Sequence, residues 1–353
     1  MAPAGSASPA PRPGPGSAAF WQGNALGART ARFTLTVMGP FAAVPLLGEG
    51  GWIAYALLIA ILGFMMDVGG PVRVRLAAIA IGAAVILAGA AIGTATTHSE
   101  AGLALALAGA GVAYALVESL HPSAAFAARF LCISLAVGSL YVPLTLTEAA
   151  IVAGFVVYTG LVSVLWDRAT GQWRPRTGPH LRDVVAHIRA SRCERLLFAA
   201  IVAVTVCLAF LTSEALGLKR PQWTLLAIVV GLKADPVASR KMIGHFLAGT
   251  LVGVAIALGF GTLVTTPKGL LVGVTLAAAA RWPAQQIHTV LGVAAITAFA
   301  LLILELVAVL THTASHAPLD RAVDVLVGCG FALVALELNL LAQRRICRTG
   351  GAA

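Results

Sequence analysis

The sequence predicts an all-α polytopic membrane protein with about 12 transmembrane helices. Composition is the first reason: apolar residues make up 59% of the chain and charged residues 11%, with a mean hydropathy of +0.91. So few charges cannot cover the surface of a soluble protein, so most of this surface must face lipid. The second reason is pattern, because long apolar runs alternate with short basic loops.

Each spanning helix needs roughly 20 apolar residues. The first half contains six apolar runs, at about 33–48, 52–66, 75–97, 102–119, 124–142 and 148–166. The second half contains six more, at about 195–213, 222–234, 243–264, 268–281, 287–311 and 321–342. Three runs are short, which leaves open whether they span fully: 52–66, 222–234 and 268–281.

These runs divide the chain into five regions. Residues 1–30, rich in Ala, Pro, Gly and Ser, form a disordered cytoplasmic tail. Residues 31–166 and 195–343 are two six-helix units, and 344–353 are a basic cytoplasmic tail. Residues 167–194 form a basic cytoplasmic linker, within which apolar side chains recur on one helical face. We expect an amphipathic helix there, lying on the inner leaflet.

The two halves repeat one plan. Residues 223–261 are two apolar runs hinged on a charged turn that carries Asp235. Residues 52–93 repeat this arrangement around Asp67. An even number of helices in each half gives both halves the same orientation. We therefore expect two parallel repeats related by an axis along the membrane normal, with any site near that axis.

Lysine and arginine residues in the loops set the orientation. With both termini in the cytoplasm, all but four of the 24 basic residues fall on the inner side or near it. The four exceptions are Lys219, Arg220, Lys268 and Arg321. The formal charge of +10 does not indicate nucleic acid, because the basic residues sit in short loops without interleaved aromatic residues.

The sequence does not predict an enzyme, and it indicates neither a cofactor nor a metal. Nucleophile, zinc-protease and phosphate-binding motifs are missing from the printed sequence. Glu118-x-x-His121 has the spacing of a di-metal ligand pair, but such a site needs two copies and further carboxylates. An interfacial pair at the end of the fourth run is the simpler interpretation.

Glu305 lies inside the apolar run LLILELVAV. A carboxylate there costs at least about 2.5 kcal/mol on insertion, so it should face the bundle interior. One interpretation is a group that binds and releases the coupling proton, charged when water reaches it and neutral when sealed in. The other is a hydrogen-bonded packing residue.

A candidate substrate site lies at the inner ends of the helices. His121-Pro122 and Trp282-Pro283 each precede the fifth predicted helix of their half, and the helix start that follows directs a positive dipole inward. The polar side chains nearby are Arg129, Arg281, Gln285 and His288. We expect them to receive an organic anion, although arginines also collect at inner helix ends for reasons of topology alone.

Glycine pairs spaced four apart mark helices that approach closely. They occur at Gly89 and Gly93, at Gly249 and Gly253, and at Gly269 and Gly273. Packing is the expected role. These faces also leave room for a homo-oligomer.

Two stretches resemble a known family. The residues that carry the resemblance are Trp223, Asp235, Arg240, Gly249, Thr250 and Gly253, then Arg321, Asp324 and Gly328. Over about 195–345 the chain resembles the fusaric acid resistance protein-like family, which includes bacterial aromatic acid exporters and is related to plant aluminium-activated malate transporters. The resemblance implies a bacterial inner-membrane protein that acts on small organic acids. Where an arginine is expected before Gly249, this chain has His245 and Phe246.

Three functions remain after these observations. The first is a secondary transporter that exports small aromatic or amphipathic organic acids, coupled to protons. The second is an organic-anion channel, in which Arg129 and Arg281 would line the pore and Glu305 would only pack. The third is a membrane scaffold subunit that transports nothing.

Overall fold

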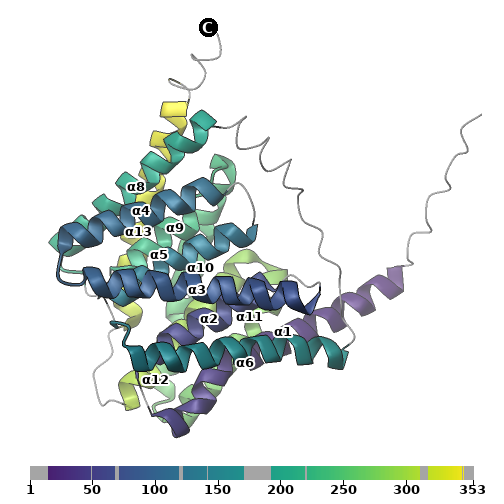
Figure 1. Ribbon diagram of the computed structural model, residues 1–353. Coiled ribbons are helices and arrows are strands. Elements are labelled where there is room, and N and C mark those ends of the chain that lie inside the picture. The colour runs from purple at the N-terminus through teal and green to yellow at the C-terminus, as the bar shows by residue number, and fades with distance from the viewer. Residues whose placement is uncertain are drawn as a thin grey trace, which may run out of the picture.

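The computed structural model describes residues 15–48, 50–67, 71–118, 122–140, 142–170, 192–218, 221–310, 317–343 and 345. Within these residues the regular structure is entirely helical, with 12 helices and no strand (Figure 1). The first six are α1 (Pro15–Leu47), α2 (Trp52–Met66), α3 (Val72–Thr96), α4 (Glu100–Glu118), α5 (Pro122–Leu140) and α6 (Leu146–Thr170). The others are α8 (Arg192–Ala215), α9 (Gln222–Gly231), α10 (Pro236–Leu263), α11 (Pro267–Ile287), α12 (Thr289–Leu310) and α13 (Ala317–Ala342). Most of the predicted linker helix lies outside the described residues.

Eight of the described helices are long and apolar enough to cross a membrane: α1, α3, α4, α6, α8, α10, α12 and α13. The apolar helices α2 and α9 are shorter, as is the described apolar part of α5, and α11 is not among the eight. The runs 52–66 and 222–234 are therefore short in the structure too, whereas 268–281 belongs to a helix of 21 residues. The chain is a multi-pass membrane protein.

Local sequence explains where several helices begin. Asp235 caps α10, because its carboxylate accepts hydrogen bonds from the backbone of Val237 at 3.0 Å and of Ala238 at 3.3 Å. Pro236 occupies the first helical position, where its missing N–H costs nothing. Thr266 and Pro267 start α11 in the same way. Capping residues thus define the turns before and after α10, the longest described helix of the second half.

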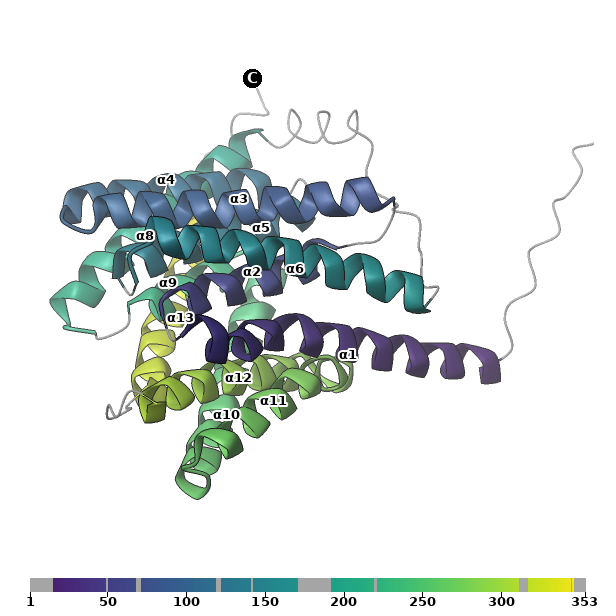
Figure 2. The same cartoon turned by 60° about the horizontal axis from the view of Figure 1, so that its bottom comes forward.

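Helix contacts recur between the two halves. The contact of α3 with α5 corresponds to that of α10 with α12, and the contact of α2 with α6 corresponds to that of α9 with α13. In the same way, the contact of α4 with α5 corresponds to that of α11 with α12. Two contacts join the halves in a matching way, because α4 packs on α8 and α1 packs on α11. Figure 2 shows α1 between the α10–α12 group and the layer of α3, α4 and α6.

Glycines allow the closest of these crossings. A Cβ on Gly93 would strike the backbone carbonyl of Leu135 in α5. A Cβ on Gly253 would lie 2.6 Å from the carbonyl oxygen of Ala294 in α12. The predicted packing role therefore holds for these pairs. The third pair differs, since a Cβ on Gly273 would meet the ring of Phe260, a side chain, rather than another backbone.

Charged side chains tie four helices of the first half together. Arg75 on α3 is 2% exposed and donates to both carboxylate oxygens of Asp67, each at 2.7 Å. It also donates to Asp167 and, at 2.5 Å, to the Ser163 hydroxyl, both on α6. Arg32 on α1 pairs with Asp67 at 2.9 Å. Burial alone raises the pKa of Asp67, but the hydrogen bond from Arg75 and the charge of Arg32 outweigh it, so the pKa lies below its ordinary value.

Four details differ from the sequence-based expectation. Helix α1 begins at Pro15, inside the segment 1–30 predicted to be a disordered tail. Pro283 does not precede the fifth helix of its half, because it lies in the last turns of α11 and the next helix begins only after His288. Arg321, which the loop count places outside the membrane, is buried in α13. Cys193 is disulfide-bonded, although the five cysteines of the sequence are scattered and lack the spacing expected of a disulfide framework.

Candidate functional site

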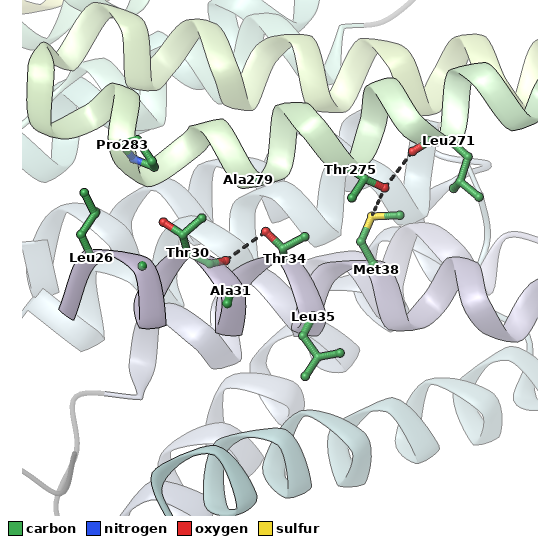
Figure 3. A pocket seen from close by; sticks show the side chains of 11 residues that line it. Leu26, Thr30, Ala31, Thr34, Leu35, Met38, Leu271, Thr275, Ala279 and Pro283 are labelled. Atoms are coloured by element: carbon green, nitrogen blue, oxygen red, sulfur yellow. Dashed lines mark hydrogen bonds between the residues drawn. The ribbon is translucent and has the colours of Figure 1, made fainter. Parts of the chain in front are cut away.

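An open groove of about 830 Å³ runs between α1 and α11 (Figure 3). The side chains that line it are mostly apolar or carry a single hydroxyl. They are Leu26, Gly27, Thr30, Ala31, Thr34, Leu35 and Met38 on α1, and Leu271, Thr275, Ala279 and Pro283 on α11. A volume of this size falls in the range of sites for small organic ligands.

The walls of the groove are only weakly polar, because two of their three threonine hydroxyls bond within their own helices, whereas that of Thr30 is buried without a hydrogen-bond partner among the described residues. Thr34 donates to the Thr30 carbonyl at 2.9 Å, and Thr275 donates to the Leu271 carbonyl at 2.8 Å. Thr30, Thr34 and Met38 project toward α11, and Thr275 projects back toward α1 (Figure 3). Leu35 is 49% exposed, so one rim faces the surroundings of the bundle. The groove therefore suits an apolar or aromatic body.

Two arginines lie close to Leu26 and Pro283 along the chain and contact the Trp282 ring, although Arg29, Arg281 and Trp282 do not line the groove. The guanidinium carbon of Arg29 lies 3.7 Å from the Trp282 ring centre, and that of Arg281 lies 5.1 Å from it. Trp282 is itself buried against Phe33 and Phe64, with ring centres 6.0 and 5.7 Å away. The tryptophan thus holds two like charges beside one another. A bound anion would relieve their repulsion.

The predicted substrate residues fall into two separate clusters. Arg281 donates to the Gln285 side-chain oxygen at 2.7 Å, and the Gln285 amide reaches Thr289 at 3.4 Å. His288 ends α11, and its ring lies 5.3 Å from that of His245 on α10. The structure therefore places Arg281, Gln285 and His288 along one helix end, next to the groove.

Arg129 belongs to the other cluster. It pairs with Glu118 at 3.6 Å and donates to the Tyr114 hydroxyl at 3.3 Å. Glu118 also accepts from the backbone N–H of Ala234 at 2.9 Å. Arg129 therefore links α4, α5 and the turn after α9. These contacts give it a packing role and do not bring it to Arg281.

Glu305 is half-buried near the end of α12. The added Cβ of an alanine at Gly261 on α10 would lie 3.9 Å from its carboxyl carbon. Across the residues that the structure describes, no hydrogen bond or ion pair joins it to another side chain. Glu305 thus faces α10, and its carboxyl group is unconstrained by a partner of that kind.

The family motif residues have packing or capping contacts. Arg240 forms an exposed ion pair with Glu337, and Thr250 is fully buried in α10. A Cβ on Gly249 would lie 2.5 Å from the Val293 Cβ in α12, and one on Gly328 would strike the Thr224 carbonyl in α9. Trp223, Arg321 and Asp324 meet where α9 begins. Asp235 is the α10 cap described above.

Sequence reasoning missed Arg29 and the role of Trp282. Both Arg29 and Arg281 are inner-side charges in the sequence, but Arg29 falls in the segment assigned to a tail. The signal that could have found it is the spacing of Arg29, Arg32 and Phe33, which extends the first apolar run backward on one helical face. Among the described residues, no group of three or more His, Cys, Asp or Glu side chains could hold a metal ion.

Comparison with known proteins supports the resemblance drawn from the motifs. Residues 206–335, from α8 into α13, match the family described as fusaric acid resistance protein-like. No curated protein and no solved structure matches the chain. The matched segment contains Arg281, Gln285 and His288 and the α11 wall of the groove. The resemblance to the fusaric acid resistance protein-like family is thus confirmed over residues 206–335 of this multi-pass membrane protein, and it points to membrane transport or efflux.

Proposed function

We propose that the protein is a secondary transporter that exports small amphipathic or aromatic organic acids across the bacterial inner membrane. The observation that carries this proposal is the groove between α1 and α11 together with Arg29 and Arg281, which lie over the ring of Trp282, the residue before the groove residue Pro283. The apolar walls fit a ring or short chain, and the two guanidinium groups fit a carboxylate. An amphipathic acid needs both at once.

The matching helix contacts support two parallel six-helix repeats, and the basic residues of the inner loops support placing both termini inside. In this arrangement α1 to α6 correspond in order to α8 to α13, and each contact named for the first half has its counterpart in the second. The Arg29 end of the groove then faces the cytoplasm. An acid would enter there from the inner leaflet or from the cytoplasm, which is the direction that export requires.

Glu305 is the residue we assign to proton coupling. It lies on α12, which packs on both α10 and α11, so it shares a helix group with the groove. A carboxylate at membrane depth is costly unless it binds a proton or a partner. If Glu305 binds a proton from the outer side and releases it to the cytoplasm in each cycle, acid export is coupled to proton entry.

Uptake of labelled benzoate into inverted membrane vesicles tests the proposal. We expect uptake that depends on an imposed pH gradient, and about a tenfold loss with Arg281→Gln, which corresponds to one lost charged hydrogen bond. Arg240→Gln, which changes an exposed arginine far from the groove in sequence, is the matched control. If uptake changes neither with the pH gradient nor with Glu305→Gln, proton coupling through Glu305 is excluded.

The channel alternative predicts a different readout. Planar-bilayer recordings with benzoate or malate as the main anion would show unitary currents far above transporter turnover. Absence of both current and gradient-driven uptake, with a stable co-purifying partner, would instead favour the scaffold function.

A further inference from the structure

Among the described residues, Arg321 is the most deeply buried cation of the second half that the transport proposal does not use. It is 3% exposed, and its Nε and Nη1 atoms have no hydrogen-bond partner in the part of the chain that the structure describes. Its Nη2 reaches only the Thr297 hydroxyl, at 3.5 Å. A guanidinium group has five N–H donors, and burying them without hydrogen bonds costs free energy. A bound acceptor would therefore stabilise this side chain.

Trp223 adds a second unused donor at the same place. The guanidinium carbon of Arg321 lies 3.8 Å from its ring centre, and its own indole N–H is buried without a partner. Trp223 is the second residue of α9, a helix whose preceding residue, Pro221, provides no side-chain cap. The first amides of α9 and its positive dipole end thus lie beside Arg321.

Helix α9 is too short to cross a membrane. It has 10 residues, so it is about 15 Å long, against a hydrocarbon core of roughly 30 Å. Its far end is fixed at the level where α4 ends. There, the Leu232 carbonyl accepts from Tyr114 at 2.5 Å, and the Ala234 N–H donates to Glu118, the last residue of α4.

Close packing of α9 on α13 holds this arrangement. The Thr224 hydroxyl donates to the Asp324 carbonyl at 3.0 Å, and Gly328 leaves no room for a side chain against Thr224. Asp324 is 1% exposed and lies one turn along α13 from Arg321, so its charge offsets that of the arginine. Gln222, the first residue of α9, has a buried side-chain oxygen that accepts no hydrogen bond from the described residues, but the guanidinium group, the indole N–H and the first amides of α9 still leave an excess of donors.

We propose that Arg321, the Trp223 indole N–H and the N-terminus of α9 form a second binding position, at membrane depth, for the carboxyl group of the transported acid. This inference rests on the proposed function. A carboxyl group matches the site because its two oxygens accept from a planar guanidinium group in parallel. The donor atoms are shielded in this conformation, so the acid reaches them when α9 shifts against α13.

Equilibrium binding of labelled benzoate to the purified, detergent-solubilised protein tests this position. The measurements use the Arg281→Gln background, which removes the arginine of the groove from the comparison. We expect saturable binding in that background and about tenfold weaker binding when Trp223→Phe removes the indole N–H but keeps a ring. Arg321→Gln should abolish binding. Trp223→Phe keeps the test meaningful if Arg321→Gln fails to fold.

Two matched controls accompany these variants. Trp52 begins α2 as Trp223 begins α9, but it stacks on Phe155 at 5.4 Å rather than on an arginine, so Trp52→Phe should leave binding unchanged. Arg240→Gln removes an exposed arginine and should also have no effect. No saturable binding, or binding that Trp223→Phe leaves intact, overturns the site. If either of these results is found but transport persists, the binding site is rejected and the proposed function is retained. If binding depends on Trp223 and Arg321 but no transport is measured, the proposed function is rejected and the binding site is retained.

Discussion

Two of the contacts that join the halves, α4 on α8 and α1 on α11, are built from corresponding helices but filled differently. Helices α4 and α8 meet through fully buried apolar side chains, whereas α1 and α11 leave an open groove between them. The residues that fill the first contact are Leu103, Leu107, Ala110, Phe198, Val202 and Val206. At the second contact α1 offers Gly27, Thr30, Ala31 and Thr34, which are too small to close the gap.

Topology thus sets where helices meet, while side-chain volume decides what the contact does. A Cβ added to Gly111 on α4 would lie 3.4 Å from the Val202 side chain, an ordinary van der Waals contact, so one methyl group would fill the space there. The groove has about 830 Å³. We infer that the α4–α8 contact mainly stabilises the fold and that the α1–α11 contact mainly binds ligand.

The largest effect is expected from the ion cluster that holds α1 in place beside the groove. Arg75→Gln leaves Asp67 and Asp167 buried without their main partner, which should lower the free energy of unfolding by about 3–5 kcal/mol. Denaturant unfolding of the purified protein in detergent measures this. Arg240→Gln, at an ion pair whose arginine is 65% exposed, should cost less than about 1 kcal/mol. Similar losses for both variants would contradict the role given to the cluster.

A smaller loss is expected from the packed contact. Leu107 is 1% exposed, so Leu107→Ala opens a cavity and should lower the free energy of unfolding by about 3 kcal/mol. Met38→Ala at the groove should cost about 1 kcal/mol, because one side of Met38 already lacks close neighbours. The same unfolding measurement compares the two. Equal costs would mean that the contacts do not differ in packing.

Filling the groove should affect transport more than stability. Ala279→Leu adds volume inside the groove, and we expect benzoate uptake to fall about tenfold while the unfolding free energy changes by less than about 1 kcal/mol. Leu276→Phe adds volume on the same helix at a side chain that is 60% exposed and outside the groove. Uptake that falls equally in both variants would remove the groove from the transport path.

The smallest effect is a change with pH. The pKa of Asp67 lies below its ordinary value of 3.8, so the stabilisation by its ion pairs is fully present above pH 3.8 and is lost as the pH falls through the lowered value. Unfolding free energies measured from pH 7 to pH 3 should show this loss only in the acid range. Asp67→Asn should flatten that part of the curve. If the free energy of unfolding already falls near pH 6, a titrating group other than Asp67 is responsible.

The sequence predicted the helices well because apolar runs of this length have one stable form in lipid. It predicted Gly93 and Gly253 as close crossings, and Asp235 at a charged turn, because these features are local. It could not place Arg321, whose burial depends on how α9 packs on α13. It also could not separate Arg129 from Arg281, since the sequence predicts both near inner helix ends and only the packing of α4 and α5 distinguishes them.

Photolabelling with 4-benzoylbenzoate, an aromatic acid that forms a covalent bond on illumination, tests whether the α1–α11 groove binds the acid. We expect labelled peptides from residues 26–38 of α1 and 271–283 of α11, competed away by excess benzoate and lost in Arg281→Gln. Labelling spread evenly over the exposed helices, or concentrated at the α4–α8 contact and unaffected by Arg281→Gln, would contradict it.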